Sequence, residues 1–204
     1  MFADIRYEHR INALSGFTMI SEHCAKMGAR GSEDLAFVIN RYMEGILQPM
    51  EKYGGDIIKF VGDAMIVVWP RNKTDDGDLQ IIARRAVQCA LDIQLDLDNK
   101  QIMKGIGKLS VKLGIGMGQC ALLHVGGVFR RAEFFTVGDA LLQALACEGD
   151  ASGGGEIIVS KQIWESVGSH FEGLPLESGN VRVTELKKGP GHGIPAKAEK
   201  TGIE

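Results

Sequence analysis

The chain has 204 residues, 45% of them hydrophobic and 24% charged, which is the usage of an ordinary globular domain with a hydrophobic core. Its formal net charge of −3 gives no electrostatic basis for binding nucleic acid or an anionic membrane. No apolar run approaches the ~18–20 residues of a membrane span and no signal peptide is visible, so we expect a cytoplasmic protein with no membrane segment.

Periodicity in the first half of the chain predicts a strand, two helices and a hairpin. Ser32, followed by two acidic residues, is a good helix N-cap, and the glycine pair at 54–55 is a good stop. Two β-rich runs joined by Val-Gly-Asp-Ala predict a tight hairpin with Gly-Asp at its tip. In chain order, the expected elements are a strand at 2–5, helices at 16–29 and 32–53, and strands at 57–60 and 65–69.

In the second half, an amphipathic stripe includes Cys89, which we therefore expect in the core. The expected elements are a helix at 82–97, strands at 109–117, 120–125 and 133–137, a helix at 140–147, a strand at 156–160 and a helix at 161–167. This order predicts an α+β fold with helices on one face of a largely antiparallel sheet. We expect one domain at 1–186 and a flexible tail or linker at 187–204, which is rich in Lys, Gly and Pro.

Two carboxylates stand in unusual places. Asp4 ends the first hydrophobic strand, and Asp63 sits at the tip of the hairpin. If that strand pairs beside the hairpin, both carboxylates meet at one edge of the sheet, where they suit Mg²⁺ with its remaining ligands taken from water and phosphates. Amides at the helix start near Gly16 could hold phosphate oxygens, so the pattern suggests a metal-bound nucleoside triphosphate. Taken alone, each part also has a purely structural explanation; an Asp in a Gly-Asp turn, such as Asp63, is usually only a turn residue.

Five stretches together resemble the catalytic domain of class III adenylyl and guanylyl cyclases. They are FADI…SGFT, GGDIIKFVGDAMIVVW, VKLGIGMGQC, FFTVGDAL and GGGEIIVSKQIW, and they run from Phe2 to about Trp164. Within the family, the chain most resembles the first of two tandem cyclase domains in the soluble, bicarbonate-responsive branch. The resemblance implies a ferredoxin-like α+β fold, a dimer of domains, and an adenylate cyclase that converts ATP to 3′,5′-cyclic AMP and pyrophosphate.

The resemblance also implies roles for particular residues. Asp4 and Asp63 match the two catalytic aspartates that bind two Mg²⁺ or Mn²⁺ ions, and the backbone carbonyl of Ile5 matches a further metal ligand. One ion would activate the ribose 3′-hydroxyl and the other would hold the β- and γ-phosphates. The residues that match the phosphate-binding turn are Ser15, Gly16, Phe17 and Thr18.

The chain departs from active members on the short helix after Gly138. Those members carry an Asn four residues after this glycine and an Arg four residues later; here the positions are Leu142 and Ala146, whose side chains cannot donate a hydrogen bond. We therefore expect the metal-binding half of an adenylyl cyclase, which needs a complementary second domain in the same chain or another. The alternative is an inactive pseudocyclase domain that binds a nucleotide or an anion and regulates an attached or partner domain.

Lys59 matches the family lysine that contacts adenine, where guanylyl cyclases tend to carry Glu. In a first-half domain this lysine faces the second, non-catalytic pocket, so it supports an adenylyl-type lineage without proving ATP as the substrate. The family's base-reading position is Phe135 here, which cannot read a base by hydrogen bonding. Lys59 alone could attract an anion, but the Arg that completes the bicarbonate clamp is replaced by Leu145, which argues against bicarbonate control.

The spacing of the first motif is also unusual, because the family places the aspartate and the glycine turn almost next to each other. Either Arg6–Leu14 is an insertion behind a true FADI strand, or Ile11–Leu14 is the strand and Ala13 replaces the metal-binding aspartate. FADI matches the family better, so we favour the insertion, which could be a real bulge or an error in the gene model.

Overall fold

The computed structural model describes residues 2–9, 28–61, 64–71, 79–99, 109–126 and 132–188. Its strands are β1 (Phe2–His9), β2 (Asp56–Val61), β3 (Ala64–Val68), β4 (Leu109–Gly116), β5 (Ala121–Gly126), β6 (Ala132–Val137), β7 (Ile157–Val159), β8 (Phe171–Pro175) and β9 (Val181–Leu186). Its helices are α2 (Ala29–Tyr53), α3 (Leu79–Asn99), α4 (Asp139–Asp150) and α5 (Lys161–Val167). None of these helices combines the length and the hydrophobicity that a membrane span requires.

Seven strands form one sheet in the order β2-β3-β1-β4-β7-β9-β8. Every neighbouring pair in it is antiparallel except β4 and β7. The first strand lies between β3 and β4, so FADI pairs beside the hairpin, which is the condition that the predicted metal site requires. The α+β class and the largely antiparallel sheet are thereby confirmed.

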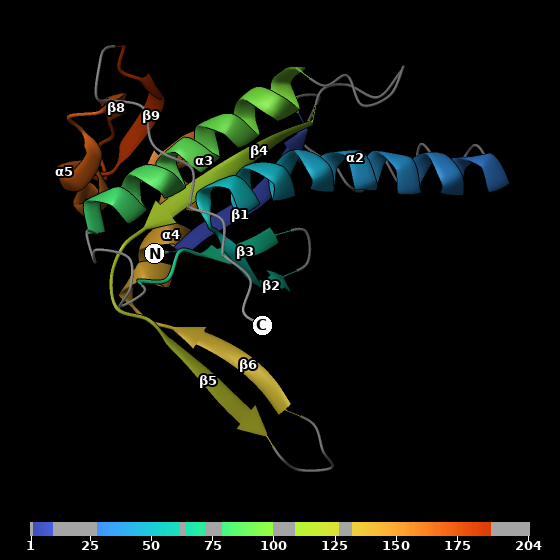
Figure 1. The fold of residues 1–204 in the computed structure, drawn as a ribbon, viewed down its shortest axis with the longest axis horizontal. Helices are drawn as coiled ribbons and strands as arrows, with labels where there is room; N and C mark the ends of the chain where they lie inside the picture. The colour runs from blue at the N-terminus through green and yellow to red at the C-terminus, as the bar shows by residue number, and fades with distance from the viewer. Residues whose placement is uncertain are drawn as a thin grey trace, which may run out of the picture.

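Helices cover both faces of the sheet, which corrects the expectation of a single helical layer (Figure 1). The main core lies between the sheet and α2, α3 and α5, and it includes Cys89 as predicted. On the other face α4 packs against β4, because its buried side chains are small and because Gly114 and Gly116 leave room for its backbone. The sequence pattern did not reveal this second layer, since a short helix with a small-residue face carries little apolar signal.

The long helix α2 begins at Ala29, three residues before the expected cap at Ser32. Gly28 precedes it with a φ of 65°, a conformation that suits glycine, and Ser32 falls inside the first turn as an exposed residue. The expected stop is confirmed, because Gly54 closes the helix in the left-handed conformation with a φ of 74°.

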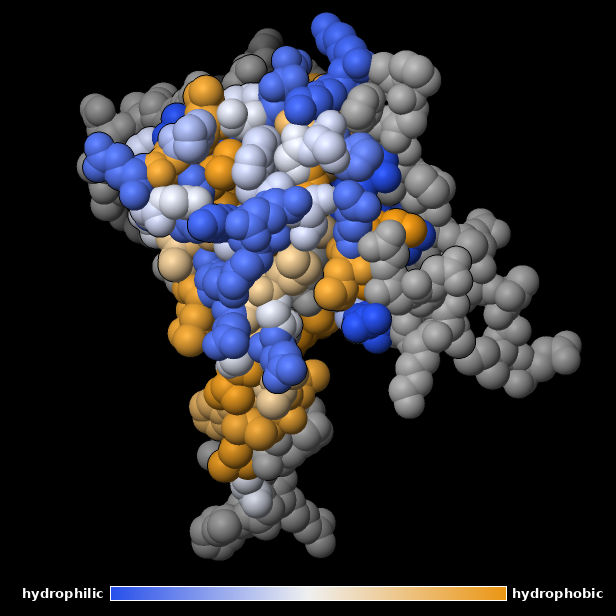
Figure 2. All heavy atoms as spheres, turned by 90° about the vertical axis from the view of Figure 1, so that its left-hand side faces the viewer, coloured by the Kyte–Doolittle hydropathy of each residue, from blue (hydrophilic) through white to orange (hydrophobic). Residues whose placement is uncertain are grey.

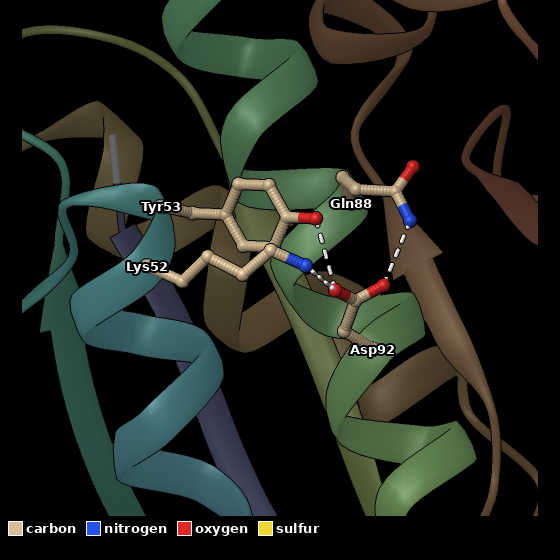
Figure 3. A network of polar contacts seen from close by, with 4 residues as sticks. All are labelled: Lys52, Tyr53, Gln88 and Asp92. Carbon is tan, nitrogen blue, oxygen red and sulfur yellow. Dashed lines mark hydrogen bonds and ion pairs between the residues drawn. The ribbon is translucent and has the colours of Figure 1, made fainter. Parts of the chain in front are cut away.

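A polar network ties the end of α2 to α3 (Figure 3). The carboxylate of Asp92 accepts hydrogen bonds of 2.9 Å each from Lys52 Nζ, Tyr53 Oη and Gln88 Nε2. Burial disfavours the charged form of Asp92, but the hydrogen bonds outweigh it and hold the pKa of this carboxyl below its usual range. Hydrogen bonds that the Lys52 ammonium donates to Tyr53 and to Asp92 raise the pKa of Lys52 in turn. The network thus links the C-terminal end of α2 to the middle of α3.

The hairpin of β8 and β9 extends the sheet beyond the elements that the sequence analysis predicts. Two predictions lie outside the described residues: the helix at 16–29, apart from its last two positions, and most of the tail at 187–204. The division of the chain at 186–187 stays a prediction, although β9 ends at Leu186.

Candidate functional site

Asp4 lies within a strand and not at its end, which corrects the sequence-based placement. β1 continues through Arg6–His9, where it pairs with Lys112–Leu109 of β4, whereas its pairing with β3 stops at Ile5. The first four residues of the supposed insertion therefore prolong β1 instead of bulging out of it, and they do so because β4 is long enough to keep pairing with them.

The register defines a row of residues across the sheet. Asp4 is paired with Ile66 of β3 on one side and with Gly114 of β4 on the other, and Ile66 is paired in turn with Lys59 of β2. The backbones of Lys59 and Asp4 are thus two strands apart, about 10 Å. The structure brings these two residues, far apart in the sequence, into one row.

The second aspartate, Asp63, lies outside the described residues, as do Ser15–Thr18 and Ala13. Ala64, which follows Asp63 in the chain, is the first residue of β3 and lies two positions from Ile66, about 7 Å along the strand. The described part of the hairpin therefore begins beside the row that contains Asp4. The meeting of the Asp4 and Asp63 carboxylates at one site stays a prediction.

Within the described residues, no group of three or more His, Cys, Asp or Glu side chains is placed to hold a metal ion. The metal ligands predicted from the family resemblance, Asp4 and Asp63 with the carbonyl of Ile5, stay a prediction. Such an all-oxygen set with few protein ligands fits Mg²⁺ or Mn²⁺, which accept water and phosphate oxygens in the remaining positions.

Lys59 has two neighbours on β6 that the sequence analysis did not connect with it. Its ammonium lies 3.7 Å from the carboxylate of Glu133 and 5.8 Å from the centre of the Phe135 ring. All three side chains are largely exposed, so the ion pair is weak. No sequence signal could have identified Glu133, because only the tertiary fold brings β2 and β6 together.

The degenerate positions on α4 face outward. Leu142 is 65% exposed and Ala146 is also exposed, whereas Ala140, Ala144 and Cys147 are fully buried against the sheet. Leu142 and Ala146 are one helical turn apart and so share a face. The face on which the family carries its Asn and Arg is therefore apolar and open in this domain.

The hairpin of β5 and β6 projects from the rest of the molecule as an arm (Figure 1). Its apolar side chains are 44–54% exposed, and Figure 2 shows them gathered on this projection. Among the side chains that the structure describes, the large exposed apolar residues of the arm are Leu122, Leu123, Val125, Phe135 and Val137. A two-stranded ribbon with apolar side chains on both faces marks a contact surface, since such a ribbon is only marginally stable alone.

Sequence comparison finds relatives named as adenylate cyclases. The chain is 30% identical over 154 residues, 74% of its length, to adenylate cyclase type 10 of Rattus norvegicus and likewise to that of Mus musculus. It is 29% identical over 110 residues, 53% of its length, to the terminal-differentiation specific adenylate cyclase of Dictyostelium discoideum. No protein-family model matches the chain.

Solved structures share the fold. The guanylate cyclase domain of a Catenaria anguillulae protein, solved with GTP, superposes with a TM-score of 0.67 at 19% identity and covers 91% of this chain and 96% of its own. The adenylyl cyclase CyaB from P. aeruginosa gives a TM-score of 0.67 at 22% identity, with 92% and 93% covered.

The chain belongs to the class III nucleotidyl cyclases. The sequence relatives reported above are named adenylate cyclases, whereas solved structures of the same fold include a guanylate cyclase domain, so the fold alone does not identify the base that is recognised. This cyclase domain spans only 9% of the length of the rat and mouse proteins, so the activity, substrate and partners of a whole protein do not transfer with the fold.

Proposed function

We propose that this domain is the metal-binding half of an adenylyl cyclase, which converts ATP to 3′,5′-cyclic AMP and pyrophosphate together with a complementary second cyclase domain. The observation that carries the proposal is the position of β1. FADI lies between β3 and β4, with Asp4 paired to Ile66, two residues from the start of β3 at Ala64. This register supports the alignment in which Asp4, and not Ala13, is the metal-binding aspartate.

The largest distance that the chain allows between the Cα atoms of Asp4 and Asp63 is short enough for one shared site. The Cα atom of Asp63 is bonded through one peptide unit to that of Ala64, so it is about 3.8 Å away from it. With Ala64 about 7 Å along β3 from the partner of Asp4, the two Cα atoms are at most about 12 Å apart. Two aspartate side chains and a pair of divalent ions span such a distance.

The residues of this chain would supply binding and orientation. Asp4 and Asp63 would each contribute one carboxylate and Ile5 a carbonyl oxygen, and Ser15–Thr18 would donate backbone amides to phosphate oxygens. Divalent ions bound there would lower the pKa of the ribose 3′-hydroxyl and neutralise phosphate charge. The domain itself would hold the triphosphate in line with the attacking hydroxyl, which is the main requirement of phosphoryl transfer.

The surface of α4 supports the need for a second domain. Leu142 and Ala146 are exposed, but neither can bind the ribose or stabilise charge on the transferring phosphate. A homodimer would have two metal-binding halves and no groups opposite them. The complement is a cyclase domain with Asn and Arg at the corresponding positions, docked against the apolar arm and α4.

The choice of ATP rests on two weaker observations. The sequence relatives are named adenylate cyclases, and Lys59 occupies the position at which the family contacts adenine. In a metal-binding half Lys59 faces the second pocket, so it supports the adenylyl lineage without itself reading the base, and in this structure it lies beside Glu133.

Reconstitution tests the proposal. The 204-residue chain is mixed with a cyclase domain that carries the missing Asn and Arg, and cyclic AMP is measured with Mn²⁺ and ATP. We expect product from the mixture only, and a loss of at least ~100-fold in Asp63→Asn. Asp56→Asn is the matched control, because Asp56 is an exposed aspartate at the opposite end of β2; it should keep full activity.

Three results would contradict the proposal in whole or in part. Absence of product from the mixture, with both domains folded and associated, would refute a catalytic half. Binding of ATP that is unchanged in Asp63→Asn, measured by calorimetry with Mn²⁺, would instead support the pseudocyclase alternative. Equal rates with ATP and GTP would refute the adenylyl assignment while leaving the cyclase half intact.

A further inference from the structure

A cavity of about 610 Å³ lies at the corner where β3 ends and the turn between β4 and β5 begins. Its floor includes Trp69 and Ile82, which are 4% and 6% exposed. Its rim includes Leu79 and Leu122, which are 44% and 54% exposed. Leu79 and Ile82 belong to α3 and Leu122 to the arm, so the cavity lies between the helical layer and the base of the arm.

The size and the lining of this cavity are those of a site for a small molecule. Ligand sites usually have volumes of 300–1,000 Å³ and mostly apolar walls with few polar groups. Here Ile58, Val68 and Met117 continue the apolar wall, and Gln119 and Cys120 provide polar side chains at the turn. A partner protein would need a larger and flatter surface than this recess.

One charged side chain lines the cavity. Among the described lining residues, Arg71 is the only ionisable group apart from the Cys120 thiol, and no carboxylate stands among them. Arg71 is exposed and has no ion-pair partner within the described part of the chain. Arginine binds carboxylates through two parallel N–H donors. We propose that this cavity binds a small apolar molecule that carries one carboxylate.

The cavity is separate from the proposed metal site. It lies at the Val68–Arg71 end of β3, whereas Asp63 precedes the other end, about 13 Å away along the strand. Its wall at Gln119 and Cys120 packs directly against Gly138, where a Cβ atom would overlap the carbonyl of Gln119. Gly138 precedes α4, so a ligand in the cavity would contact the turn that supports that helix.

Trp69 makes binding measurable, because Trp164 is the only other tryptophan. In the Trp164→Phe chain, Trp69 fluorescence is titrated with 3-(4-bromophenyl)propanoate, whose bromine quenches a nearby indole, and with the neutral amide of the same acid. We expect saturable quenching, with the amide about fivefold weaker, and no preference for the acid in Arg71→Gln. Leu122→Glu should weaken binding of the acid at least tenfold, since it removes apolar wall and adds a like charge.

Val125→Glu is the matched control. Val125 lies on the same strand as Leu122 and is 53% exposed, but it does not line the cavity. A glutamate at Val125 should therefore disturb the arm as much as one at Leu122, yet the variant should bind the acid within about twofold of the parent chain. Circular dichroism establishes that each variant is folded. In the unmodified chain, the acid should also slow alkylation of Cys120 by iodoacetamide, measured by peptide mass, because Cys120 is exposed and lines the cavity.

Three results would overturn the inference. Without saturable quenching of Trp69 and without protection of Cys120, the cavity is not a binding site. Equal binding in Leu122→Glu and Val125→Glu would place the probe elsewhere on the molecule. Equal affinity for acid and amide, unchanged in Arg71→Gln, would refute the carboxylate class of ligand.

Discussion

Gly114 is the residue that allows α4 to lie against the sheet, and Gly114→Ala tests that account. A Cβ atom at this position would overlap the carbonyl oxygen of Ala144 and lie 2.5 Å from the amide nitrogen of Glu148. Both atoms belong to the backbone of α4, so no side-chain rotation relieves the overlap. The helix would have to retreat by about 1 Å to restore ordinary contact distances.

The cost follows from what α4 buries. Ala140, Ala144 and Cys147 are fully buried on its inner face. A gap of ~1 Å forfeits a quarter to a half of their dispersion contacts, and overpacking itself costs ~1–3 kcal/mol. We expect Gly114→Ala to lower the free energy of unfolding by about 2–4 kcal/mol, which moves the midpoint of urea unfolding down by about 1–1.5 M.

Gly149→Ala is the control, because Gly149 also lies on α4 and an added Cβ would have nothing within 4 Å. This substitution should raise the free energy of unfolding by ~0.5 kcal/mol, since alanine favours the helix over glycine. In urea unfolding followed by circular dichroism, the free energy of unfolding should therefore fall in Gly114→Ala and rise in Gly149→Ala, relative to the parent chain. A Gly114→Ala chain as stable as the parent would refute the close approach of α4 to β4.

Further predictions concern the helix network, the arm and α4. Asp92→Asn should lower the free energy of unfolding by about 1–3 kcal/mol at neutral pH. Because folding lowers the pKa of Asp92, this loss of stability should persist above about pH 4 and shrink as the pH falls through the folded-state pKa. Urea unfolding of the parent and the variant at pH 7 and pH 3 measures the difference. The parent chain should self-associate weakly in sedimentation at high concentration, and Val125→Glu should make it monomeric. If Leu142 and Ala146 are the missing half of the site, the double variant Leu142→Asn, Ala146→Arg should let two copies of this chain form cyclic AMP without a second protein.

Elements with a strong local signal are predicted correctly from the sequence. The hairpin of β2 and β3 has β-rich runs around a Gly-Asp turn, and α3 has a continuous apolar stripe; both occur where expected. The hairpin of β8 and β9 was missed, although Val181 and Val183 alternate with polar residues and face the core. That signal is only a few residues long, and short strands are set by their neighbours in the sheet as much as by their own sequence.

The candidate site was predictable only in part, because it is built from pairings between distant strands. The site prediction requires β1 to lie beside the hairpin, and it does, but the continuation of β1 past Ile5 depends on the length of β4, which no residue in β1 encodes. The contact of Lys59 with Glu133 likewise depends on how the arm leaves the sheet. Local patterns specify elements, whereas these contacts follow from the packing of the whole domain.

The central place of β1 has a consequence for how the domain is made. Its partners include Ile66 and Gly114, about 60 and 110 residues further along the chain, so its contacts close long loops. Such contacts slow folding, and translation at ~5–20 residues per second delays them by several seconds more. Until β4 has emerged from the ribosome, β1 can pair only with β3 and its other edge is left unpaired, which is the period in which a chaperone would matter most.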